Sequence, residues 1–222
     1  MADDVGSCVD ILYDDQRWRD LDFSMELLMQ KIVDELLKQD QLDVIRNSIA
    51  YSVKISVLLS NDCCLQLLNH RYRERNKVAN VLSFPNITDF SDVQSFVHTP
   101  AKPAKQQSVG DGVSFGNGCD KSYATTASVD CDMKEAEKDD LHIGDIALGY
   151  EEILRESIEY GVRFEVRVAH LFLHGLLHLF GFVHDNDTDR EVMEGIEISL
   201  LRKLRYAHPY ILVKRDILDK IE

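Results

Sequence analysis

No stretch of the sequence is apolar enough to cross a membrane, because no apolar run approaches the roughly 18–20 residues that a spanning helix needs. The N-terminal MADDVGSCVDILYDD has neither the basic segment nor the apolar core of a secretion signal. The five cysteines are odd in number and include no CxxC pair, which is typical of reduced thiols and not of a disulfide-stabilised fold. These absences predict a cytoplasmic protein with no membrane partner.

Positive charge is scarce as well. The chain has 25 Lys and Arg against 39 Asp and Glu, a net charge of −14. Sequence-independent nucleic-acid binding depends on basic surface that displaces counterions, so this total speaks against it. A local basic patch can still dominate one binding face of an acidic protein.

The length of 222 residues and an apolar content of 45% fit one globular domain, residues 1–222. Periodic apolar patterns predict strands at 9–13, 50–59, 81–85 and 141–148, and helices at 24–37, 62–69, 151–159, 164–180 and 187–205. The order shows no regular strand–helix–strand alternation. We therefore expect an α+β fold, in which a small mixed sheet packs on helices around a central buried helix at 164–180.

Residues 86–140 differ in composition from the rest of the chain. They are rich in Ser, Thr, Asn, Gln and Gly, show no sustained periodicity, and contain five Lys against ten Asp and Glu. This composition predicts a flexible acidic insertion within the domain.

Residues 174–184 read HGLLHLFGFVH and fit the zinc-protease pattern H-E-x-x-H-x-x-G-x-x-H, except that glycine replaces the glutamate that acts as base. On a helix, His174 and His178 share one face. Gly181 can take a positive φ, end the helix and return the chain so that His184 becomes the third ligand. Three imidazoles with an open fourth position predict a zincin-like site for one Zn²⁺ per chain, although nickel, copper or iron also suit these ligands.

The alternative is that these histidines are core residues with hydrogen-bond partners. Four of the eight histidines fall within 170–184, and burying several imidazoles without a metal or matching partners is costly. His170, one turn before His174, is expected to support the site or pack beside it. Gly175 lies inside a helix, where glycine is unfavourable, so we expect backbone or substrate to pass close to it.

A basic stretch, RYRERNK at 71–77, stands out in the acidic chain. Its basic residues alternate and, with Glu74, give a local charge of +3; they are Arg71, Arg73, Arg75 and Lys77. In an extended conformation all four would point the same way, and the planar arginine fork matches a phosphate. We expect Arg71 and Lys77 to bind substrate here, unless the stretch is a solvated loop that binds nothing.

HGLLHLFGFVH resembles the H-G-x-L-H-L-x-G-[YF]-D-H signature of the YbeY family, bacterial rRNA maturation factors and single-strand-specific endoribonucleases. LNHRYRERNKVANVLSF at 68–84 and LHIGDIAL at 141–148 are similar to two further motifs of that family, in the same order. Several features depart from the family pattern. Val183 replaces an Asp, Asn76 and Ala79 stand where Asp and Thr are usual, and the connection at 86–140 is longer.

The resemblance implies a zinc site at His174, His178 and His184 and a functional arginine at Arg73. It implies a zinc-dependent single-strand-specific endoribonuclease that acts in rRNA maturation, at the 3′ end of 16S rRNA, and in ribosome quality control. The implied partners are single-stranded RNA or rRNA, the small ribosomal subunit and an Era-type GTPase. Asp145 is expected either to orient a ligand histidine or to have a structural role at the end of its strand.

The missing glutamate favours RNA over peptide as the substrate. Peptide hydrolysis needs a base that also protonates the leaving amine, whereas RNA carries its own nucleophile in the 2′-hydroxyl. A metal and an arginine can then suffice for slow cleavage, with water or the 2′-hydroxyl attacking. Two alternatives remain: a non-catalytic ribosome-assembly factor with a structural zinc, and a metalloprotease, which the glycine disfavours.

Overall fold

The computed structural model describes residues 6–39, 42, 52–86 and 140–210. The insertion expected at 86–140 lies almost entirely outside these residues, and so does the start of the strand expected at 50–59. Among the described helices, none combines the length and apolar character needed to cross a bilayer.

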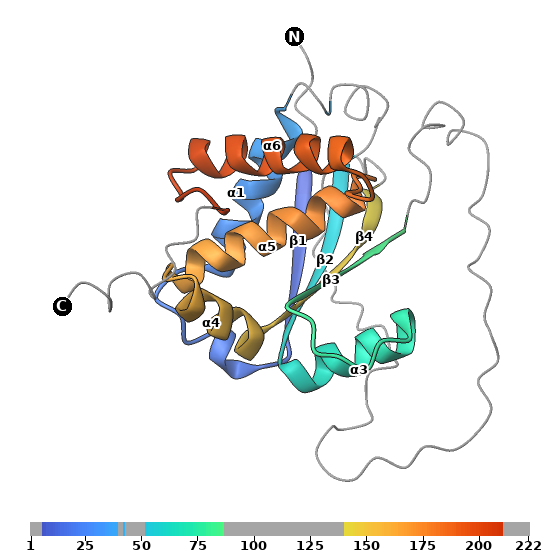
Figure 1. The fold of residues 1–222 in the computed structure, drawn as a ribbon, viewed down its shortest axis with the longest axis vertical. Helices are drawn as coiled ribbons and strands as arrows, with labels where there is room; N and C mark the ends of the chain where they lie inside the picture. Colours follow the sequence, from blue (N-terminus) through green and yellow to red (C-terminus); the bar gives the residue numbers. More distant parts are fainter. Residues whose placement is uncertain (1–5, 40–41, 43–51, 87–139, 211–222) are drawn as a thin grey trace, which may run out of the picture.

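A mixed sheet forms the centre of the described part of the chain, with its four strands in the order β1-β2-β4-β3 (Figure 1). The parallel strands are β1 (Ser7–Tyr13), β2 (Ser52–Ser60) and β4 (Asp140–Gly149). At one edge, β3 (Val81–Pro85) pairs antiparallel with β4. The position of β3 at the edge leaves one side of its backbone available to other elements.

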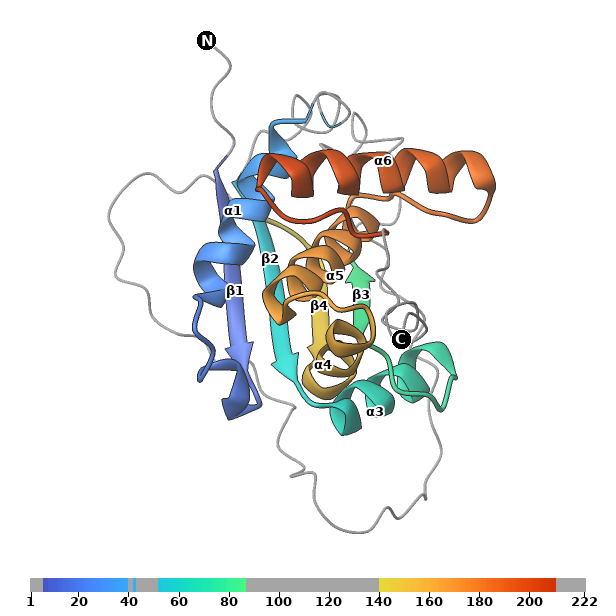
Figure 2. The ribbon, with the colours of Figure 1, turned by 60° about the vertical axis from the view of Figure 1, so that its left-hand side comes forward.

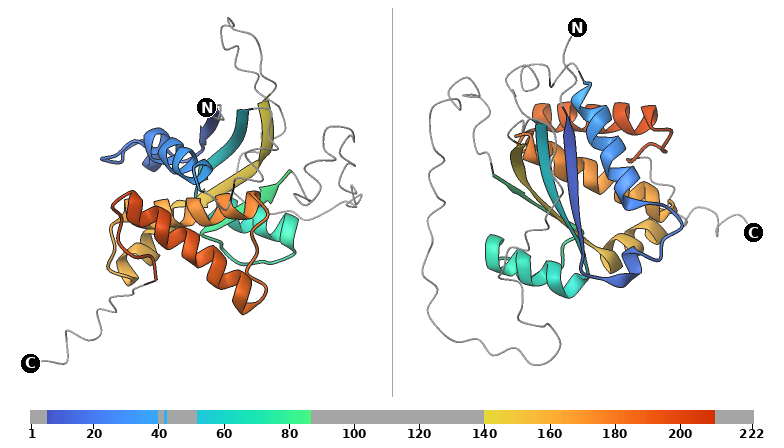
Figure 3. Two further views of the ribbon diagram at one scale, coloured as in Figure 1. Left: turned by 90° about the horizontal axis from the view of Figure 1, so that it is seen from above. Right: turned by 180° about the vertical axis from the view of Figure 1, so that it is seen from behind.

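One face of the sheet carries the main core. Here α1 (Met25–Leu37) and α5 (Phe164–Leu179) pack on the strands, and α6 (Asp187–Lys203) covers α5 from outside (Figure 2). The short α4 (Tyr150–Glu159) lies against the N-terminal half of α5. In the view from behind, the strands lie in front of α5, and α1 lies beside β1 (Figure 3, right).

The opposite face is covered near its β3 edge by α3 (Asp62–Arg73). Adjacent residues of β4 show the two faces, because Ile146 belongs to the main core and Ala147 to a small cluster with Leu65 of α3 and Leu82 of β3. This is the alternation expected of a strand covered on both faces.

The structure confirms the α+β class and the central buried helix. From Val168 to Leu179, α5 is buried except at His174 and His178. A helix that is apolar nearly all round must be buried on all sides. The sheet covers one side of α5, and α6 covers the other. The only polar breaks in this stretch that stay accessible are therefore two of the candidate ligands.

The helix expected at 62–69 is longer in the structure. It continues to Arg73, and its cap is Asn61, whose side chain accepts a hydrogen bond from the Cys64 N–H. Arginine is a good helix former, and basic side chains in the last turn favour the helix C-terminus. Arg71 and Arg73 thus lie on a helix, two residues apart, where they do not face the same way.

Candidate metal centre

The C-terminal half of α5 carries two of the three histidines expected to bind a metal. The imidazole centroids of His174 and His178 lie 4.7 Å apart, and their Nε2 atoms lie 3.2 Å apart. Their spacing of one helical turn fixes this separation, because both side chains leave a helix held on two sides by the core.

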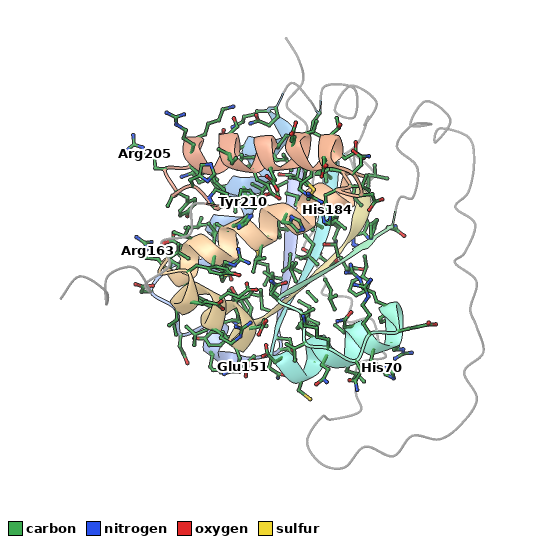
Figure 4. All side chains as sticks on the ribbon, viewed as in Figure 1. His70, Glu151, Arg163, His184, Arg205 and Tyr210 are labelled. Atoms are coloured by element: carbon green, nitrogen blue, oxygen red, sulfur yellow. The ribbon has the colours of Figure 1, made fainter. Side chains whose placement is uncertain are left out.

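The third histidine is returned to the pair by the turn after α5. Gly181 has φ of 84°, which confirms the predicted left-handed turn at this glycine. The His184 ring centroid lies 5.5 Å from that of His174 and 5.1 Å from that of His178. One ligand nitrogen from each ring lies within 4.8 Å of the others, and the site sits where Figure 4 labels His184.

The hydrogen bonds of the Nδ1 atoms determine which nitrogens face the centre. His174 Nδ1 lies 2.8 Å from Glu197 Oε1, and His178 Nδ1 lies 2.9 Å from the carbonyl oxygen of Phe182. Both partners accept, so each Nδ1 donates, and in the neutral form of each ring the Nε2 keeps its lone pair. Two lone pairs therefore face each other across 3.2 Å.

This arrangement fits a metal ion. Two nitrogens bound to one tetrahedral zinc at about 2.0–2.1 Å would lie about 3.3 Å apart, close to the separation of the two Nε2 atoms. Burial is the largest cause that lowers the pKa of His178 below its ordinary value, followed by the charge of His174. Both favour the neutral imidazole, which is the form that binds metal. The three histidines can therefore hold a metal ion.

Glu197 of α6 supports this centre from behind. Its side chain is fully buried, and its Oε2 takes a hydrogen bond from His170 Nε2 at 3.2 Å and another from the Tyr210 hydroxyl. Burial alone would raise the pKa of Glu197, but the hydrogen bonds from His170 and His174 outweigh burial and lower the pKa to about 2. Glu197 is therefore a carboxylate, which orients a ligand imidazole and increases its basicity.

The polar chain extends away from the metal through His170. Arg167 Nη1 lies 2.9 Å from His170 Nδ1, and because arginine only donates, His170 accepts there and donates from Nε2 to Glu197. Arg167 in turn forms an ion pair with buried Glu156 at 2.8 Å, and Asn80 Nδ2 donates to the same carboxylate at 2.9 Å. His170 thus supports the site, as expected, and has a defined tautomer.

Sequence reasoning did not identify the role of Glu197. Its signal is an acidic residue on the apolar face of a helix, since the buried residues of α6 follow the helical period: Met193, Ile196, Glu197, Leu200 and Leu201. A carboxylate in such a position requires a partner, and the histidine stripe of α5 is the partner that the fold provides. Asp145, the candidate proposed instead, contacts His142 at 3.3 Å and not one of the ligand histidines.

The close approach expected at Gly175 is the edge strand. A Cβ at this position would lie 2.9 Å from Ser83 Oγ, 3.2 Å from Val81 Cγ2 and 3.4 Å from Ile146 Cγ2. The absence of a side chain lets α5 pack directly against β3 and β4. The position that holds the catalytic base in a zinc protease is therefore occupied by the sheet.

Arg73 reaches the same region from the other face of the sheet. Its Nη2 donates to the carbonyl oxygen of Ser83 at 3.2 Å, at the outer edge of β3. The side chain of Arg73 is exposed but partly desolvated where it meets β3, and this partial desolvation is the main cause that lowers its pKa, with the nearby charge of Arg75 adding to it. The Arg73 charge also contributes to the lowered pKa of His178, so the charge of the guanidinium acts on one of the candidate ligands.

The contacts of Arg71 and Lys77 are with residues other than the three histidines. Arg71 is exposed, with its guanidinium 5.6 Å from the Tyr72 ring centroid. Lys77 is exposed and near Glu152, whose pKa it helps to lower. Both lie in the segment that surrounds Arg73, at the C-terminal end of α3 and just after it.

The chain is similar to several known proteins. The family model described as endoribonuclease YbeY matches residues 12–205. A protein named Endoribonuclease YbeY from Ehrlichia canis (strain Jake) is 28% identical over 165 residues, which are 74% of this chain and 76% of that protein. The solution structure of TM1509 from Thermotoga maritima is also similar, with a TM-score of 0.42 and 15% identity over 89% of this chain and 92% of that one.

Proposed function

Because the chain belongs to the YbeY endoribonuclease family, we propose that it is a zinc-dependent endoribonuclease that cuts single-stranded RNA. The observation that carries this proposal is the meeting of three histidine nitrogens within 4.8 Å of one another beside an arginine anchored at 3.2 Å to the adjacent strand edge. Three neutral ligands leave a coordination position for substrate or water, as in catalytic zinc sites.

His174, His178 and His184 hold the ion in this proposal, and Glu197 and the Phe182 carbonyl fix the orientation of two of the rings. The bound metal supplies a Lewis acid that polarises a phosphate oxygen or lowers the pKa of a water molecule. His184 is the exposed member of the set, so the open side of the site faces the exterior.

Arg73 binds the phosphate that is cut. Its contact with the Ser83 carbonyl uses one donor, and the planar guanidinium has four more to offer to phosphate oxygens. In this position the charge of Arg73 stabilises the negative charge that develops on the phosphoryl group during cleavage. Arg71 and Lys77 extend the same positive segment and bind the flanking backbone of the substrate.

Gly175 supplies no general base, which suits RNA better than peptide. The leaving group of a phosphodiester is an alkoxide, and the 2′-hydroxyl or a water molecule is the nucleophile. Peptide cleavage would lack a contribution of about 10²–10⁴-fold from acid–base catalysis. The geometry therefore supports a nuclease and not a protease.

The proposed substrate is rRNA, with cleavage at the 3′ end of 16S rRNA in maturation and a role in ribosome quality control in the cytoplasm. The proposed partners are the small ribosomal subunit and an Era-type GTPase. Family membership supports this assignment, and the net charge of −14 supports a substrate presented by a ribosomal particle over unselective capture of RNA.

The decisive experiment measures cleavage of a labelled single-stranded RNA by zinc-loaded protein. We expect wild type to cut and His174→Ala and Arg73→Ala to lose at least about 100-fold in rate, the typical effect of removing one transition-state stabiliser. Arg73→Lys keeps the charge but not the fork, and should recover only part of the loss.

Arg202→Ala, an exposed change on α6, serves as the matched control and should cut like wild type. Equal cleavage by all variants would mean that the activity belongs to a contaminant. If no preparation cuts free RNA or small subunits, the assembly-factor alternative replaces this proposal, and chelator-sensitive peptide cleavage would replace it with a protease.

A further inference from the structure

A second feature of the same face of the molecule is a cavity of about 340 Å³ that begins at His174 and runs along α5 away from the metal centre. Two aromatic side chains, Tyr160 of the α4 end and Tyr210 of the segment after α6, line it together with the apolar Val81, Leu171 and Pro209. The position of Tyr210 between α5 and α6 is visible in Figure 4.

The charges around this cavity are already balanced. Arg167, its cationic lining residue, pairs with Glu156 at 2.8 Å and contacts His170 at 2.9 Å. Behind the wall lies the buried carboxyl group of Glu197, which accepts hydrogen bonds from His170 and Tyr210. A phosphate entering here would have to compete with two buried carboxylates, so the lining favours an uncharged, planar and partly apolar group.

The cavity also lies at a distance from the metal that suits an RNA strand. Arg167, His170 and His174 follow one another on one face of α5, and seven residues of helix span about 10 Å. A strand whose phosphate meets the three histidines and Arg73 reaches this cavity with a neighbouring nucleotide. Aromatic side chains beside a nuclease centre are the usual platforms on which single-stranded bases stack.

We propose that this cavity is a nucleobase subsite, in which the base of a nucleotide next to the cleaved phosphate packs against Tyr210 and Tyr160. The inference rests on the proposed RNA substrate and adds the recognition of a base to that of the phosphate. Stacking on an aromatic face is tolerant of sequence, so the subsite selects an unpaired base over a paired one. It thereby accounts for a preference for single strands in an acidic protein.

The test is a coupling experiment with a fluorescent single-stranded RNA and with copies that carry one abasic ribose at successive positions. Anisotropy with zinc-loaded protein, recorded before cleavage begins, gives the affinity. We expect one abasic position next to the cut site to weaken binding to wild type about 10-fold, the size of one stacking contact. Tyr210→Ala and Tyr160→Ala should bind intact RNA about as weakly, with no further loss from the abasic site.

Tyr210→Phe separates this role from a positioning role, because the Tyr210 hydroxyl donates to Glu197. The stacking role predicts that the phenylalanine variant binds RNA like wild type. A loss in Tyr210→Phe equal to that in Tyr210→Ala would overturn the subsite, and so would an abasic penalty that persists unchanged in both alanine variants. If the abasic position and the tyrosine substitutions are coupled in binding but the protein does not cut RNA, the proposed nuclease is contradicted and the subsite stands. If the protein cuts RNA but shows no such coupling, the subsite is contradicted and the nuclease stands.

Discussion

Glu197 has no exposed surface, yet its two carboxylate oxygens serve two histidines and a tyrosine. A buried carboxylate is stable only when such donors replace the water that it has lost. Since one of these donors is the Nδ1 of His174, the carboxylate also fixes which nitrogen of that ring faces the metal. A single acidic side chain on α6 thus controls the chemistry of a ligand on α5.

Glu197→Gln tests this control. The amide preserves the shape of the side chain but removes the charge and one acceptor, so zinc affinity measured by competition with a chelating dye should fall about 10- to 100-fold. Glu191→Gln, an exposed change on the same helix, should leave the affinity unchanged. An unaltered affinity in Glu197→Gln would show that the carboxylate has a structural role only.

Gly175→Glu introduces the glutamate of the zinc-protease pattern, but we expect it to confer no peptide hydrolysis. The new side chain would meet Ser83 and Val81 within 3.2 Å, so overpacking should lower the free energy of unfolding by about 2 kcal/mol or more. Gly195→Glu is the matched control, because nothing lies within 4 Å of a Cβ there. Urea denaturation should show that variant to be at least as stable as wild type, since glycine disfavours helix.

At the scale of elements, the C-terminal end of α3 determines where Arg73 lies. Glu74 closes the helix in the left-handed conformation, with φ of 56°, and its N–H reaches the carbonyls of Asn69 and His70. The turn directs the chain back toward β3 and leaves Arg73 in the last helical position. The end of this helix is therefore part of the phosphate-binding arrangement that we propose.

Glu74→Gly and Glu74→Ala form a pair that measures the strain at this turn. Both remove the negative charge, but only glycine adopts a positive φ without a steric penalty, so the glycine variant should be more stable by about 1 kcal/mol in urea. Both should bind RNA at least as tightly as wild type, because a carboxylate next to Arg73 is gone. Equal stabilities would show that Glu74 is not strained.

The strongly periodic elements were predictable because burial sets their pattern. For α1, the apolar spacing from Met25 to Leu37 predicted the helix and Ser24 marked its start, and the strand at 81–85 was predicted with its observed bounds. The alternating charges at 71–77 were misleading, since an alternation of solvated side chains does not distinguish strand from helix. The helix expected at 187–205 begins at Asp187, as predicted, after the cap Asn186, and ends at Lys203.

At the scale of the whole molecule, the candidate metal centre joins elements that lie far apart along the chain. The ligands come from α5 and the turn after it, their orientation comes from α6, and Arg73 comes from the opposite face of the sheet. Local sequence predicted the three histidines together, because their spacing lies within one helical turn and one return. It could not show that Glu197 or the Ser83 carbonyl would join them, since only tertiary packing brings these groups to the site.

A bound metal should therefore stabilise the whole domain. At a zinc concentration of 100 times Kd, the free energy of unfolding should rise by about 2.7 kcal/mol, seen as a higher Tm in calorimetry and reversed by a chelator. His184→Ala should lose most of this rise, whereas His208→Ala, also exposed, should keep it. A rise of equal size in both variants would mean that zinc binds elsewhere.

The register of β3 and β4 has a consequence for how the chain tolerates a change in length. Pro85 and Gly144 are paired residues of β3 and β4, and the Asn86 N–H donates to the Ile143 carbonyl at 2.9 Å. The two ends of the connection between β3 and β4 are therefore held next to each other, whatever the length of the connection. Loop-closure entropy then grows only with the logarithm of that length, about 0.6 kcal/mol for each doubling, so the segment between these strands can lengthen greatly while the histidines and Arg73 keep their places.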